Sequence, residues 1–228
     1  MGNPEQPFAT NLLNFGWHSE TAFGHHEISY TLSRTHHQHC CCGTNDRIYT
    51  EADNKRILYL LDSTHHELVK LVRTISETDF FFRIDSNTWS PNDIIEHLGL
   101  IDEGYVRELW FALSQPSFPD SYLDSTRGGD AKAIAYATQP EKGKARGTNL
   151  PRDRYCNKET CVRIFTDAND LAKEFYRKNA GKDLRRFYIF RVDGRGGRTI
   201  RDLHQLGLLL IAHRIRHINQ LKEIAGIP

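Results

Sequence analysis

Apolar positions recur at three- and four-residue steps in four segments of the chain, which is the spacing of an amphipathic helix. The first segment follows Thr50 and Asp53, which have capping-box spacing, and predicts a helix from about 51 to 77. The second follows Ser90, with a proline at the first helical position, and predicts a helix that reaches about residue 113.

The other two helical segments lie in the C-terminal part of the chain. One predicts a helix from about 158 to 179, with Gly181 as its stop signal. The last segment begins where Thr199 and Asp202 repeat the capping-box spacing, and its helix is expected to extend to about residue 225.

The second and third predicted helices are joined by a long connection from about 114 to 155, rich in Gly, Pro, Arg and Lys and without a clear apolar period. Such a length is more typical of a functional crossover than of a plain turn. The segment from Arg185 to Val192 fits either a short strand or a helical turn. Four long helices with one long connection predict an all-α fold, a four-helix bundle.

Residues 1–49 differ from the predicted bundle, residues 50–228. They hold six of the 12 histidines and no lysine, and they show no helical or strand period. We therefore predict an irregular, flexible N-terminal extension. Its soft and borderline metal ligands, which could bind zinc or nickel adventitiously, are His36, His37, His39 and Cys40–Cys42. No folded framework would hold them in place, so a flexible arm is favoured.

Composition adds limits on partners and location. The 30 Lys and Arg residues nearly balance 29 Asp and Glu residues, so the net charge of +1 gives no reason to expect nucleic-acid binding. The longest apolar run, Leu206–Ala212, is too short to span a membrane, and no secretory signal is evident. Five cysteines, three of them adjacent, are a poor disulfide framework and favour a reducing, cytoplasmic location.

The candidate chemistry begins with His213 and His217, which lie four residues apart and therefore on one face of the last predicted helix. Their stripe is otherwise mostly apolar, from Leu206 to Ile224, and burying two unpaired imidazoles there would cost desolvation unless a ligand, a metal or a hydrogen-bond network offset it. His97 lies on a similar apolar surface of the second helix. Three neutral imidazoles leave positions for water, which is typical of a reactive metal rather than a structural one.

An isolated His-x-x-x-His pair also has a plainer interpretation, because a histidine on an apolar helix face is usually a core residue with a hydrogen bond. Two other metal-site classes are excluded. Ferritin-like di-iron bundles need paired Glu-x-x-His motifs and zincins need His-Glu-x-x-His, and the chain has neither.

Residues near the three histidines have competing interpretations. Glu96 points about 100° away from His97 on a helix, so we expect a surface or interhelical charge rather than a base. Gln220 lies one turn beyond His217, where it either orients a metal ligand or substrate, or serves in packing or capping. We expect Trp89 to close the end of the bundle, and solvent-exposed positions for His204, His65 and His66.

Two segments carry a resemblance to a known family. Trp89–Leu98 and Asp202–Leu221 resemble the two motifs of the DinB / YfiT superfamily of metal-binding four-helix bundles, over about residues 52–226. The resemblance implies that His97, His213 and His217 bind a divalent metal ion, which could be Zn, Ni, Mn or Fe. It also implies an up-down-down-up helix order, a long crossing from the second helix to the third, and often a homodimer.

The function implied by the resemblance is that of a metal-dependent enzyme. The ion would act as a Lewis acid, in a hydrolase or in a low-molecular-weight thiol S-transferase, on a small-molecule substrate or with a thiol cofactor. The alternative is a non-catalytic metal-binding or interaction bundle. The extension and the enlarged crossover depart from the family pattern, and both would border the mouth of the metal site.

Overall fold

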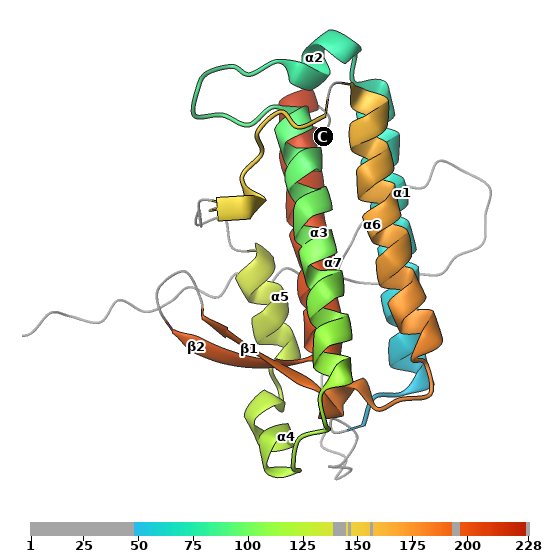
Figure 1. Ribbon diagram of the computed structural model, residues 1–228. Coiled ribbons are helices and arrows are strands. Elements are labelled where there is room, and N and C mark those ends of the chain that lie inside the picture. The colour runs from blue at the N-terminus through green and yellow to red at the C-terminus, as the bar shows by residue number, and fades with distance from the viewer. Residues whose placement is uncertain (1–47, 139–144, 146, 156, 193–196, 227–228) are drawn as a thin grey trace, which may run out of the picture. The chain divides into compact units, whose positions relative to one another are not determined.

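The computed structural model describes residues 48–138, 145, 147–155, 157–192 and 197–226. Four long helices dominate it: α1 (Glu51–Thr74), α3 (Pro91–Ser114), α6 (Lys158–Lys178) and α7 (Leu203–Ala225). Figure 1 shows that α3 and α6 run in one direction and α1 and α7 in the other. The predicted all-α four-helix bundle with up-down-down-up order is confirmed. The predicted extension lies outside the described residues except at its last two positions, so it stays a prediction.

Each long helix packs against two of the others. Helix α1 contacts α6 and α7, and α3 contacts the same two helices from the opposite side. The short helix α2 (Glu77–Phe81) lies in the connection from α1 to α3. No helix in the described parts of the chain combines the length and the apolarity that crossing a membrane requires.

Two of the predicted helix starts are confirmed in atomic detail. The backbone N–H of Asp53 donates to the Thr50 hydroxyl at 3.1 Å, and the Asp53 carboxylate accepts from the Thr50 backbone N–H at 2.9 Å. Ser90 and Asp93 make the same reciprocal pair at 3.2 and 2.8 Å. These bonds satisfy backbone donors that a helix end otherwise leaves without a partner. Helix α6 ends where the sequence predicted, at the C-cap Asn179, but Gly181 is not its stop residue because it does not adopt a positive φ.

The start of the last helix also differs from the prediction. Thr199 lies in a strand, β2 (Arg198–Asp202), which pairs antiparallel with β1 (Tyr188–Val192). The N-cap is Asp202, whose carboxylate accepts from the backbone N–H of Gln205 at 2.8 Å. For Arg185 to Val192 the sequence allowed either a strand or a helical turn. The segment contains both, because a short 3₁₀ turn, η3 (Leu184–Arg186), precedes β1.

The crossover between α3 and α6 contains structure that the sequence pattern did not predict. Two helices, α4 (Ser121–Thr126) and α5 (Asp130–Thr138), are followed by the 3₁₀ turn η2 (Gly147–Asn149). Helix α5 packs along α7, and η2 packs against α3 (Figure 1). The crossover therefore covers the side of the bundle where α3 and α7 meet.

The core of the bundle consists of two apolar groups. The group nearer the β-hairpin includes Ile57, Leu109, Phe175 and Leu209. The other group includes Leu68, Ile94, Phe165 and Leu221. Burial of such side chains contributes roughly 1.5–3 kcal/mol each to folding.

A polar layer separates these two groups. The Arg214 guanidinium of α7 is fully buried and forms an ion pair with Asp102 of α3 at 2.8 Å. Its Nη1 donates to the Asn169 side-chain oxygen of α6 at 2.8 Å and to the Leu61 carbonyl of α1 at 3.2 Å. One side chain thus joins all four long helices.

Candidate metal centre

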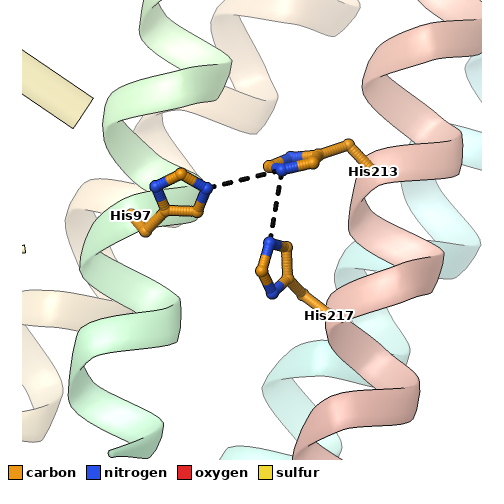
Figure 2. Close-up of side chains that lie close together, drawn as sticks. All are labelled: His97, His213 and His217. Atoms are coloured by element: carbon orange, nitrogen blue, oxygen red, sulfur yellow. Dashed lines mark hydrogen bonds between the residues drawn. The ribbon is translucent and has the colours of Figure 1, made fainter. Parts of the chain in front are cut away.

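The three histidines that the sequence singled out come together between α3 and α7. His97 lies in the second turn of α3, and its Nε2 is 3.4 Å from Nε2 of His213. The Nε2 of His217 lies 3.2 Å from the same atom. Figure 2 shows the three rings with these nitrogens turned toward one another. One ligand atom from each residue lies within 4.8 Å of the others, so the group could hold a metal ion.

Hydrogen bonds on the far side of two rings fix where their protons are. The Nδ1 of His97 lies 2.8 Å from the carbonyl oxygen of Asn149 in η2, and Nδ1 of His217 lies 2.9 Å from Oε1 of Gln220. Both partners are oxygens that only accept, so Nδ1 carries the proton in each neutral ring. The Nε2 lone pairs of His97 and His217 therefore face the third ring.

His213 receives both of these lone pairs at a single atom. A protonated Nε2 could donate its one hydrogen to only one of the two neighbouring nitrogens. Its Nδ1 is buried and has no hydrogen-bond partner among the described residues. A divalent ion would satisfy all three lone pairs. With metal–nitrogen distances of about 2.0–2.1 Å, the nitrogens of a tetrahedral site lie about 3.3 Å apart, close to both observed separations.

Burial keeps the three rings neutral, which is the form that binds metal. Loss of solvation lowers the pKa of His97, although the Asn149 carbonyl partly offsets this effect. Burial lowers the pKa of His213 well below its usual range, and the neighbouring His217 and His97 lower it further. The pKa of His217 falls to about 3 for the same main reason.

Trp89 lies against the three-histidine site. Its ring centroid is 4.8 Å from that of His97 and 6.1 Å from that of His217, with the latter pair stacked. The indole therefore covers one side of the site. The expectation that Trp89 closes the end of the bundle is refined to this position against the imidazoles.

Glu96 has a role that the sequence did not suggest. Its side chain is fully buried, and its oxygens accept from the backbone N–H of Arg152 at 2.9 Å and of Arg154 at 3.2 Å. The Arg154 guanidinium forms an ion pair with it as well. Glu96 is neither a surface nor an interhelical charge. It holds the end of the crossover, which includes the Asn149 carbonyl that orients His97.

Two of the three histidines expected at the surface lie elsewhere. His204 is only 4% exposed, and its Nε2 lies 3.4 Å from the Asp130 carboxylate of α5. His65 is half-buried and bonds to the Thr166 hydroxyl at 3.0 Å. Both expectations were wrong, because α5 covers His204 and α6 covers His65. These helices are distant in sequence from the histidines they cover, so the local pattern does not reveal the contact. His66 is exposed, as expected.

The lowered pKa of His217 predicts acid sensitivity of the metal-free protein. A histidine in the unfolded chain has a pKa of about 6.5, so below that pH His217 is protonated in the unfolded chain but stays neutral in the folded site. Stability is therefore lost as the pH falls from about 6.5 toward 3. Between pH 7 and 5, the metal-free wild type should lose about 2 kcal/mol more than His217→Gln. Urea unfolding at both pH values measures this, and equal losses would contradict it.

The bond from His217 to Gln220 predicts an effect on metal affinity. Gln220→Leu removes the oxygen that holds the Nδ1 proton of His217, so its ring can turn and change tautomer. We expect zinc affinity to fall by roughly 10–100-fold, measured by competition with a chromophoric chelator. The matched control is Asn219→Ala, which changes the neighbouring exposed amide and should leave affinity unchanged. Equal affinity of the Gln220→Leu variant and the wild type would refute this role.

Comparison with known proteins agrees with this geometry. A family model described as the DinB superfamily matches residues 60–221, a range that includes all three histidines, Glu96 and Gln220. Neither the curated proteins nor the solved structures gave a match. The matched range covers well over half of the 228 residues and includes most of each long helix. The chain therefore belongs to the DinB superfamily.

Proposed function

We propose that His97, His213 and His217 hold a divalent metal ion in an enzyme that acts on a small molecule. The observation that carries this proposal is the convergence of two fixed Nε2 lone pairs on the Nε2 of His213. Neutral imidazoles are suitable ligands for Zn, Ni and Fe. The family resemblance adds Mn to these candidates. Three protein ligands leave coordination positions open for a reactant.

The chemistry that such an ion supplies is Lewis-acid activation of a water molecule or of a low-molecular-weight thiol. The first alternative corresponds to a hydrolase and the second to a thiol S-transferase, as the family resemblance implies. Asn149 and Gln220 keep the protons of His97 and His217 on Nδ1, which leaves Nε2 free to bind. Trp89 keeps water away from one side of the rings.

A second candidate is a non-catalytic metal-binding bundle. It is favoured by the position of Glu96, the carboxylate next to His97 in the chain, whose oxygens are already bonded to residues 152 and 154. Glu96 is therefore not available as a general base. The two candidates differ in whether the bound metal accepts an additional ligand.

The test uses cobalt, because the visible spectrum of Co(II) reports on its ligands. The full chain is titrated with Co(II), together with a variant in which His36, His37 and His39 are changed to glutamine and Cys40, Cys41 and Cys42 to serine, to remove the adventitious ligands of the N-terminal segment. One equivalent of cobalt and a spectral change on adding 2-mercaptoethanol would support the enzyme. One equivalent with no change on adding 2-mercaptoethanol, azide or cyanide would favour the non-catalytic bundle. Absence of cobalt binding would overturn both.

The proposal includes a reducing, cytoplasmic location. It is supported by Cys161, which is buried and free of any disulfide. The homodimer implied by the family resemblance also stays a prediction, and light scattering of the purified full chain measures it.

A further inference from the structure

Arg216 lies on α7 between two of the metal-site histidines in sequence, three residues after His213 and one before His217. A separation of three residues places it within about 60° of His213 around the helix. Its side chain is half-buried. The helix position therefore places Arg216 beside the three-histidine site, and its positive charge accordingly lowers the pKa of His97, His213 and His217.

Other partly or fully buried arginines each have a partner. The acidic partners are Asp130 and Asp202 for Arg185, Asp120 for Arg186, Glu108 for Arg191 and Asp102 for Arg214. Arg201 lies over the ring of Tyr136. Within the described parts of the chain, Arg216 has no hydrogen bond, ion pair or ring contact. A charge removed from water without a partner is costly, so the position of Arg216 calls for an external anion.

The acids near the start of α3 cannot supply this anion. Glu96 is bonded to Arg154, and Asp93 is bonded to Arg83 at 2.6 Å. The three imidazoles are neutral ligands. A divalent ion at the three-histidine site would therefore add two positive charges beside Arg216, with no carboxylate among the metal ligands to balance them.

We propose that the small molecule bound at this site carries an oxyanion, with a carboxylate as the simplest case, and that Arg216 binds it while the reactive atom faces the three histidines. This inference rests on the proposed metal-dependent function and names its substrate class. A guanidinium suits the role because its planar fork of N–H donors matches the two oxygens of a carboxylate. Arg216 is thus a specificity-determining residue.

The experiment compares two thiols of the same length that differ in charge, 3-mercaptopropionate and its methyl ester. Each is titrated into the cobalt-loaded full chain, and the cobalt–thiolate absorption gives a dissociation constant without any turnover. Hydrogen bonds to charged groups change affinity by roughly 10–100-fold, so the wild type should bind the carboxylate that much more tightly than the ester. Arg216→Gln should remove this preference, and Arg216→Lys should keep part of it.

The matched control is Arg163→Gln, which removes an exposed arginine of α6 and should retain the full preference. Failure of the wild type to bind cobalt would overturn the metal site together with this inference. Cobalt binding with equal affinity for the two thiols, or a preference that survives in Arg216→Gln, would overturn the inference alone. If neither thiol changes the spectrum, calorimetry with acetate and acetamide makes the same comparison. Binding of acetate by the wild type but not by Arg216→Gln supports the proposal, and equal heats overturn it.

Discussion

Replacing His213 with alanine is expected to abolish stoichiometric binding of a divalent metal ion. The Nε2 of His213 is the atom that both other rings approach, at 3.4 and 3.2 Å. Without it, two imidazoles remain on different helices with nothing between them. Because the site supplies only three protein ligands, we expect zinc affinity to fall by about a thousand-fold, measured by chelator competition and by metal analysis of the purified protein.

The control for this substitution is His66→Ala, which removes an exposed histidine of α1 and should keep one equivalent of zinc. Circular dichroism should show unchanged helix content in His213→Ala, because the Nδ1 of His213 has no partner to lose among the described residues. A His213→Ala protein that still binds one equivalent of zinc, with the ligands at His36, His37, His39 and Cys40–Cys42 also removed, would disprove the assigned ligand set.

Replacing Asp102 with alanine is expected to lower the free energy of unfolding by about 3–5 kcal/mol. Asp102 and Arg214 are both fully buried, and the pair lies between the two apolar groups of the core. Removing the carboxylate leaves the buried Arg214 guanidinium without a charged partner among the described residues, in contact with the neutral oxygens of Asn169 and Leu61 and the ring of Phe165. Urea or thermal unfolding of the metal-free protein measures the loss.

Two further variants make this prediction specific. Glu103→Ala changes the next residue, whose exposed pair with Arg107 is worth less than about 1 kcal/mol. The double variant Asp102→Leu with Arg214→Met removes both charges, so it should recover most of the stability lost in Asp102→Ala. A loss in Asp102→Ala no larger than that in Glu103→Ala would show that the ion pair does not stabilise the bundle.

The sequence predicted the bundle where local chemistry determines structure. The capping pairs at Thr50 and Ser90 were identified correctly because each bond joins residues three apart. The pair at Thr199 has the same spacing but lies in β2, where Thr199 pairs with Arg191. Pairing between strands depends on residues that local spacing does not reveal, so the capping interpretation failed there.

Long-range packing explains the other differences. Helix α5 lies in a segment with weak periodicity, and its packing along α7 buries His204. Arg214 follows His213 directly, yet it reaches the interior while His213 turns toward His97. Only the packing of the other three long helices determines which of these two neighbours enters the core.

The grouping of His97, His213 and His217 could be predicted because their spacing and helix positions are local signals. The residues that hold them in place gave no such signal, apart from Gln220. Asn149 acts through its backbone carbonyl. Glu96 acts through bonds to Arg152 and Arg154, which lie 56 and 58 positions further along the chain.

The bond from Asn149 to His97 has a consequence for how the crossover can evolve. Every amino acid supplies a main-chain oxygen, so the identity of residue 149 is free to drift while the imidazole stays correctly oriented. An insertion or deletion between this position and Arg152 would displace that oxygen relative to the contact with Glu96. Relatives that share the three histidines should therefore vary in amino-acid identity between positions 149 and 152 while keeping the length of this segment.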